Sequence, residues 1–163
     1  MFGTKLIGLL FTLSFSMNVA LADTRLPDEN TLVKRFDALG LVKADKWKNA
    51  EASDSTEIKS ARVNGDIYSI ASDSISVLSF LSGKDSEVEA QHVVAVCTEL
   101  AKVAMQNVTT ETTNKIKGVI QKSALNFNED SDMVDGYKFT TKSYAFGNTP
   151  AVGCMIEGFV TWN

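Results

Sequence analysis

Residues 56–81 of this chain read TEIKSARVNGDIYSIASDSISVLSFL, and they contain the strongest local structural signal of the chain. Asn64-Gly65 lies near its middle, and both residues tolerate the positive φ angles that a two-residue type I′ turn requires. The turn predicts a hairpin with arms at 56–63 and 66–72. A second, serine-rich turn then leads into a β-rich run over 75–81, so the stretch predicts three consecutive antiparallel strands.

The serines in and around this stretch are interleaved with apolar residues. Ten serines occur between Ser53 and Ser86, where they are mixed with Ile, Val, Leu and Phe. Such mixing is typical of antiparallel strands that pack one face on a core and expose the other to water. We therefore expect strands with one wetter face.

A helical periodicity replaces this pattern further along the chain. Over 85–106 the apolar residues fall on one broad face of a helix, and Cys97 lies near the middle of that face. The pattern breaks at 107–110, where Thr109 or Thr110 can cap a second helix. These features together predict an αα-hairpin.

The segments before the hairpin are shorter and more polar. Acidic residues at 28–29 and a glycine at Gly40 delimit a short amphipathic N-terminal helix, since acids favour a helix start and glycine a helix end. Residues 43–55 carry one large apolar side chain, Trp47. We interpret them as a solvated connection with a single anchor.

The C-terminal part adds a loop and a second hairpin. Residues 126–136 are rich in Asp, Glu and Asn and predict an acidic loop. Aromatic and β-branched segments at 137–146 and 151–162 flank a turn at 147–150. The predicted class is α+β: an antiparallel sheet of about five strands, a three-strand meander plus the C-terminal hairpin, with the N-terminal helix and the central αα-hairpin packed on it.

The first 22 residues are typical of a signal peptide. Lys5 supplies a positive start, an apolar run follows, and Ala20-Leu21-Ala22 supplies the cleavage pattern. We expect a mature chain of residues 23–163, a single domain that is periplasmic or secreted and free of the membrane after cleavage. Retention of the run as an anchor is the alternative, since about 20 apolar residues span a bilayer.

Net charge restricts the class of partner. Cleavage removes one lysine and no acid, which leaves 15 basic and 20 acidic side chains and a net charge of -5. Nucleic acids and anionic membranes bind clusters of Lys and Arg, and the arginines of this chain are scattered. We expect neither as the main partner, and expect instead another protein with a basic site.

Cys97 and Cys154 are the two cysteines of the chain. In an oxidising compartment they can form a disulfide, which would stabilise the fold by about 4 kcal/mol on the chain-entropy model. Gly153 precedes Cys154, and its missing side chain would let a helix approach the strand closely. We expect a structural bond, with free buried thiols as the main alternative. A redox pair is the lesser alternative, because the sequence has no Cys-x-x-Cys motif.

No catalytic or cofactor motif stands out. His92 is the only histidine, which excludes metal clusters of several imidazoles, and its position suits a surface hydrogen bond. Asn128, Asp130 and Asp132 alternate as in a calcium loop, but Met133 stands where that loop needs glycine. We expect no enzyme, cofactor or metal; an unrecognised pair of catalytic carboxylates is the alternative.

The expected function is non-catalytic binding. Small size, export, a disulfide and negative charge favour an inhibitor or immunity-type protein that blocks another protein. Its candidate contacts are the acidic loop and two aromatic residues beside the C-terminal turn: Glu129, Asp130, Asp132, Asp135, Tyr144 and Phe146. The alternative is a small ligand held in a cavity between helices and sheet, where small side chains would leave room: Ala90, Ala95, Ala101 and Ala104.

Overall fold

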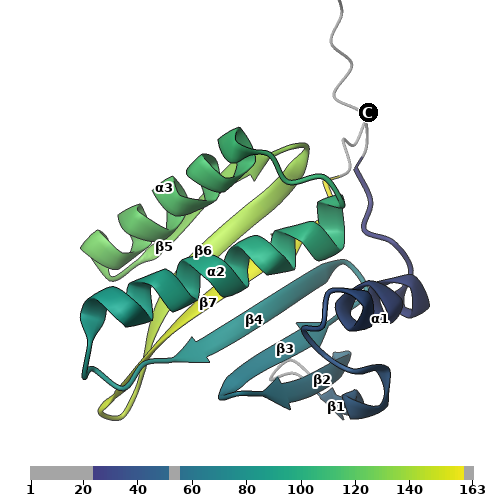
Figure 1. The fold of residues 1–163 in the computed structure, drawn as a ribbon, viewed down its shortest axis with the longest axis horizontal. Coiled ribbons are helices and arrows are strands. Elements are labelled where there is room, and N and C mark those ends of the chain that lie inside the picture. The colour runs from purple at the N-terminus through teal and green to yellow at the C-terminus, as the bar shows by residue number, and fades with distance from the viewer. Residues whose placement is uncertain (1–23, 52–55, 160–163) are drawn as a thin grey trace, which may run out of the picture.

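The computed structural model describes residues 24–51 and 56–159 and shows an α+β fold. In this part of the chain, three α-helices lie on one side of a seven-stranded antiparallel sheet (Figure 1). The predicted signal peptide lies outside the described residues. The elements in chain order are α1 (Glu29–Ala38), the 3-10 turn η1 (Ala44–Lys46), β1 (Lys48–Glu51), β2 (Glu57–Val63), β3 (Asp66–Ile70), β4 (Ser74–Phe80), α2 (Ser86–Met105), α3 (Thr110–Asn126), β5 (Glu129–Val134), β6 (Tyr137–Phe146) and β7 (Thr149–Glu157).

The sheet consists of two meanders joined edge to edge. Its strand order is β1-β2-β3-β4-β7-β6-β5, and every neighbouring pair is antiparallel. The predicted meander over 56–81 is confirmed as β2, β3 and β4. Asn64 and Gly65 form the turn between β2 and β3 and both have positive φ angles, 53° and 94°. The predicted C-terminal hairpin is β6 and β7, and β7 pairs with β4.

The first difference from expectation is at 43–55, which is more than a solvated connection. It contains η1 and β1, and β1 pairs with β2 along its whole length. All the side chains of β1 are exposed, so no alternation marks this strand in the sequence. The expected anchor is present: the rings of Trp47 and Phe36 pack edge to face with centroids 5.0 Å apart.

The second difference is at 126–136, where the prediction of an acidic loop was wrong. Helix α3 extends to Asn126, and β5 then pairs with β6 as an edge strand of the sheet. Asp135 and Gly136 connect the two strands and both have positive φ angles, 50° and 87°. This is the same kind of turn as Asn64-Gly65. The acidic residues conceal the strand because Asp and Glu are depleted in strands.

The helix layer agrees with its prediction. Helices α2 and α3 form an αα-hairpin in which α2 packs on β4 and β7 and α3 on β5 and β6 (Figure 1). Asp85 caps α2 by accepting hydrogen bonds from the N–H groups of Glu87 and Val88. Thr109 caps α3 through a capping box with Thr112. The break expected between the two helices therefore lies where the sequence places it.

The hydrophobic core fills the space between the helices and the sheet. Burial of each large apolar side chain there stabilises the fold by about 1.5–3 kcal/mol. On the helix layer, Arg35 of α1 donates hydrogen bonds to the carbonyls of Val103 and Ala104, which fixes α1 to the end of α2. The core side chains come from all layers and include Phe36, Phe139, Leu32, Ile70, Ile75, Leu100, Ile116 and Ile156.

The predicted disulfide is confirmed. Cys97 lies in α2 and Cys154 in β7, with Cα atoms 5.8 Å apart and both side chains buried. Because β7 pairs with β4, the bond attaches α2 at the line where the two meanders meet. It therefore links the helix layer to the centre of the sheet.

Candidate functional site

The side of the sheet that faces away from the helices is here called the open face. Alternation along each strand assigns its side chains to one side or the other. In the described part of the chain, all three helices lie on the opposite side (Figure 1). The strand register aligns open-face residues in rows across the strands. Three of these rows are Phe80–Ala151–Tyr144, Arg62–Ile67–Leu78–Gly153–Lys142–Glu129 and Ser60–Ser69–Ser76–Met155–Thr140–Ser131.

Three aromatic residues gather at one end of the open face. Phe80, Tyr144 and Phe146 are here called the aromatic cluster. The ring centroid of Phe146 lies 5.6 Å from that of Phe80 and 5.9 Å from that of Tyr144. Tyr144 is 39% exposed and Phe146 51%. The Arg62 guanidinium lies 5.9 Å from the Phe80 ring centroid and the Lys142 ammonium 5.6 Å from that of Tyr144, so cations flank the cluster.

Gly153 allows the Tyr144 ring to lie close to the sheet. A Cβ atom at Gly153 would be only 2.9 Å from Cε2 of Tyr144 and 3.7 Å from Cδ1 of Leu78. The ring therefore covers the glycine of the neighbouring strand, as aromatic residues often do. The expected role of Gly153 was wrong: it faces the open side, whereas Cys154 faces the helices.

Two hollows adjoin on the open face, and the first of them lies beside the aromatic cluster. The first has a volume of about 380 Å³ and is lined by Leu78, Met155 and the cluster residue Tyr144, among others. The second has a volume of about 400 Å³ and lies over β2, β3 and β4. Ser69 and Ser76 line both hollows. The two hollows are here together called the trough, which runs across the strands.

Thr140 places an unsatisfied hydroxyl group beneath the surface of the trough. The residue is one of those that line the first hollow and is only 4% exposed. Its Oγ1 atom has no hydrogen-bond partner within residues 24–51 and 56–159. A buried polar group left without a partner costs about 1–3 kcal/mol. The alternating serines indicate a wetter face in the sequence, but they do not locate Thr140, whose strand is far from them in the chain.

The charged residues of the open face are largely paired. The ammonium nitrogen of Lys142 lies 3.4 Å from Oε2 of Glu129, and that of Lys138 lies 2.9 Å from Oε2 of Glu157. The Glu157 carboxylate raises the pKa of the Lys138 ammonium above its usual value through a hydrogen bond and charge attraction. The open face therefore presents carboxylates and ammonium groups side by side, with little net charge along β6.

The acidic residues predicted as one binding surface are not brought together. Glu129 lies on the open face beside Lys142, in the first hollow. Asp135 lies in the turn after β5, where its carboxylate accepts a hydrogen bond from the hydroxyl of Thr112 at the start of α3. Tyr144 and Phe146, in contrast, are brought together in the aromatic cluster.

Asp130 and Asp132 lie on the helix side of β5 and protect its free edge. In a hairpin with a two-residue turn, alternation directs the N–H groups of Ser131 and Met133 away from β6. The Oδ1 atoms of Asp130 and Asp132 accept these two N–H groups at 2.9 and 2.8 Å. An edge whose N–H groups are satisfied is a poor template for another strand. These acids thus have a structural role that the sequence did not reveal.

His92 hydrogen bonds with a buried carboxylate. Its Nε2 atom lies 3.1 Å from Oδ2 of Asp66, the first residue of β3, which is buried. The expected hydrogen bond of His92 is therefore confirmed, and its partner comes from the sheet. Within the described residues the ring has no serine or cysteine as a hydrogen-bond partner.

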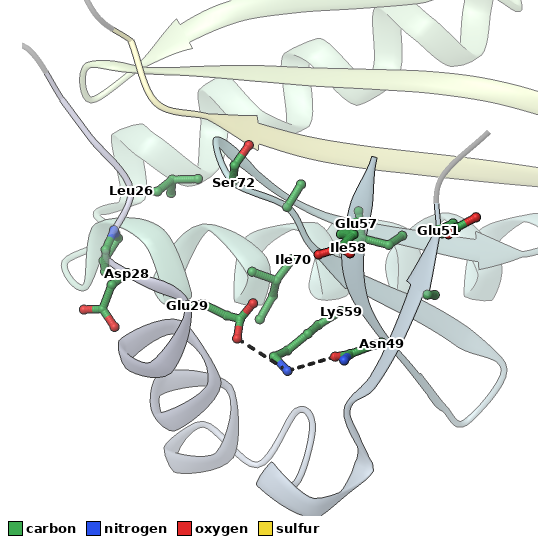
Figure 2. Close-up of a pocket in the computed structure, with 13 residues that line it drawn as sticks. Leu26, Asp28, Glu29, Asn49, Glu51, Glu57, Ile58, Lys59, Ile70 and Ser72 are labelled. Atoms are coloured by element: carbon green, nitrogen blue, oxygen red, sulfur yellow. Dashed lines mark hydrogen bonds and ion pairs between the residues drawn. The ribbon is translucent and has the colours of Figure 1, made fainter. Parts of the chain in front are cut away.

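A third hollow of about 690 Å³ lies between the start of α1 and the ends of β1, β2 and β3 (Figure 2). Figure 2 shows the side chain of Lys59 between those of Glu29 and Asn49. The ammonium nitrogen of Lys59 lies 3.4 Å from Oε1 of Glu29 and 3.2 Å from Oδ1 of Asn49. The ammonium group of Lys59 is therefore already paired. Glu51 also lines this hollow, and Ile70 supplies buried apolar surface.

Comparison of the chain with protein families, with curated proteins and with solved structures gives no match. Within the part of the chain that the structure describes, no group of three or more His, Cys, Asp or Glu residues is placed to hold a metal ion. None of the helices in that part is long and apolar enough to cross a membrane.

Proposed function

We propose that this chain is a small exported binding protein without catalytic activity, of the inhibitor or immunity type, and that it binds another protein through the aromatic cluster. The observation that carries the proposal is the exposure of Tyr144 and Phe146, stacked beside Phe80 on a side that no described helix covers. Contiguous exposed apolar surface marks interaction sites on soluble proteins. The cleavage pattern and the disulfide support export.

The surroundings of the cluster suit a protein partner. Tyr, Phe, Met and Arg are enriched at the centres of protein interfaces, and Arg62 and Met155 share the open face with the cluster. Tyr144 is held against Gly153 by close contact, so its ring loses little conformational freedom on binding. Rigid aromatic anchors of this kind supply most of the affinity in many interfaces.

The partner is proposed to carry a basic site. The expected mature chain of residues 23–163 has a net charge of -5, which attracts a basic surface over long range and speeds the encounter. Glu129, Asp130 and Asp132 lie on β5, next to the strand that carries Tyr144. Charges at the rim of an interface mainly change the association rate.

The test is capture of the partner by the mature protein from its native extract, with two matched variants. Phe146→Asn removes an exposed ring of the cluster. Phe127→Asn is the control, because Phe127 is 86% exposed at the end of α3 and lies outside the cluster. We expect a stoichiometric protein partner whose affinity falls at least tenfold with Phe146→Asn and is unchanged in the control. Equal binding by both variants would refute the proposed surface.

A small ligand is the second candidate, and the hollow between α1 and the sheet favours it because of its volume of about 690 Å³. The alanines expected to leave room do not line it. Ala90 and Ala95 are exposed, and Ala101 and Ala104 are buried in the core. Native mass spectrometry of protein purified from its source tests this candidate: a retained small molecule would support it, and an unliganded mass would count against it.

A further inference from the structure

We propose that the trough on the open face binds a neutral polyhydroxylated ligand, namely a glycan chain that lies across the strands. This site goes beyond the proposed function, which uses the aromatic cluster for a protein partner. The inference rests on four features of the trough: an unsatisfied buried hydroxyl, a lining of further hydroxyls, an aromatic ring that lies close to the sheet, and balanced charges.

The hydroxyl of Thr140 is the first feature. It is buried and has no hydrogen-bond partner in the described part of the chain, yet the residue is one of those that line the first hollow. Most buried polar groups in folded proteins are hydrogen-bonded, so an exception needs an explanation. The Oγ1 atom has almost no accessible surface as it stands, and rotation about χ1 would turn it toward the hollow. There a ligand that offers a hydroxyl group would satisfy Thr140, and an apolar side chain of a partner protein would not.

The lining of the trough is the second feature. Ser69 and Ser76 border both hollows, and Ser72 and Ser74 border the second. A serine or threonine hydroxyl both donates and accepts hydrogen bonds. The hydroxyl groups of a sugar have the same dual capacity, so a glycan can exchange hydrogen bonds with the trough at many points without any charge.

The Tyr144 ring is the third feature. Its close approach to Gly153 holds it near the sheet at the border of the first hollow. One side of a sugar ring carries mainly C–H groups and packs well on an aromatic face. Neighbouring strands lie roughly 4.8 Å apart, which is about the length of one sugar unit, so successive units of a chain can lie over successive strands.

Charge is the fourth feature and separates a neutral glycan from an anionic polymer. Each lysine on the open face of β6 faces a carboxylate: Lys142 pairs with Glu129 and Lys138 with Glu157. Such pairs offer donors and acceptors together but no net positive charge. A phosphate or carboxylate polymer would have to displace the glutamates, whereas sugar hydroxyls can bind both members of a pair.

The test is isothermal titration calorimetry of the mature, disulfide-bonded protein with three oligosaccharides: chitohexaose, cellohexaose and maltohexaose. Thr140→Val removes the unsatisfied hydroxyl at nearly constant volume. Ser131→Ala is the matched control, because Ser131 lies in the same row but lines neither hollow. We expect saturable binding of at least one oligosaccharide, a loss of at least tenfold with Thr140→Val, and no change in the control.

Thermal unfolding distinguishes a ligand role from a structural one. The Thr140 hydroxyl has no hydrogen-bond partner among the described residues. Thr140→Val should therefore keep or raise the Tm of the protein while it lowers the affinity for the oligosaccharide. Failure of all three oligosaccharides to bind, or equal binding by Thr140→Val, would overturn the glycan site.

Capture of the protein partner by Thr140→Val is measured in parallel. If that capture is lost and no sugar binds, the trough belongs to the protein interface, and the proposed protein-binding function survives without the glycan.

Discussion

The two sides of the sheet are built from the same strands and have opposite chemistry. On β4, Ile75 and Val77 face the helices and are fully buried, whereas Ser76 and Leu78 face the open side and are partly exposed. The helix side is largely apolar and continuous with the core, and the disulfide links it to α2. The open side carries hydroxyls, paired charges and exposed rings. The difference indicates that one side provides stability and the other is available for binding, and that the side on which a residue lies decides the effect of its substitution.

The largest expected effect is the loss of a core ring on the helix side. Phe139→Ala on β6 should lower the free energy of unfolding by about 3–5 kcal/mol, because the side chain is fully buried. Phe146→Ala on the same strand should cost less than about 1 kcal/mol, since this residue is 51% exposed. Urea unfolding of both variants measures the difference, and equal losses would contradict the division between the two sides.

The disulfide comes next in expected effect and also belongs to the helix side. Replacement of both Cys97 and Cys154 by Ala should lower the free energy of unfolding by about 2–5 kcal/mol. The folded variant should still bind its partner, because both sulfur atoms are buried away from the open face. Mass spectrometry after native alkylation provides the control: two free thiols in the wild-type protein would show that the bond is absent.

A smaller effect is expected from pH at the connection between β4 and α2. Glu89 accepts hydrogen bonds from the hydroxyl of Ser82 and from the N–H groups of Ser82 and Gly83, and these lower its pKa below the usual 4.5. A lowered pKa in the folded state gives stabilisation that is present above the unfolded pKa and is lost as the pH falls through the folded value.

We therefore expect the Tm of the wild-type protein to fall more steeply than that of Glu89→Gln as the pH is lowered below about 4.5. The wild-type protein should also be the more stable of the two at neutral pH. Thermal melts of both proteins over this pH range provide the measurement. Parallel pH profiles would show that Glu89 does not stabilise the loop that joins β4 to α2.

The smallest effect on stability is expected at the sheet edge. Asp130→Asn with Asp132→Asn removes two charges but keeps the side-chain oxygens that accept the N–H groups of Ser131 and Met133. The free energy of unfolding should change by less than about 0.5 kcal/mol. Association with a basic partner should become slower and less dependent on salt. Stopped-flow kinetics at low salt test this, and unchanged rates would remove the edge of β5 from the encounter surface.

Much of the fold could be predicted from local signals. The Asn64-Gly65 turn, the helical periodicity around Cys97 and the cap at Thr109 led to the correct meander, αα-hairpin and disulfide. The edge strands β1 and β5 were missed because an edge strand pairs on one side alone and its exposed side chains do not alternate. The Asp135-Gly136 turn was a readable signal, and the acidic composition around it obscured the hairpin.

The candidate site was harder to predict because it depends on pairing between distant strands. Tyr144 and Phe146 were identified from their place beside a turn. Phe80 joins them because β4 pairs with β7, which the sequence does not state. In the same way, Gly153 meets Tyr144 through the register of β6 and β7, and Thr140 lies in the trough through its position in a row. Long-range register of this kind has no local signature.

The most direct test of the open face as the binding face is hydroxyl-radical footprinting of the protein with and without its captured partner. Oxidation is compared at open-face residues and at exposed residues of the helix side. Binding should protect Tyr144, Phe146 and Met155 and leave Val88 and Leu125, which are exposed on α2 and α3, as reactive as in the free protein. Protection of Val88 and Leu125, with Tyr144 and Phe146 still reactive, would contradict this assignment and place the partner on the helices.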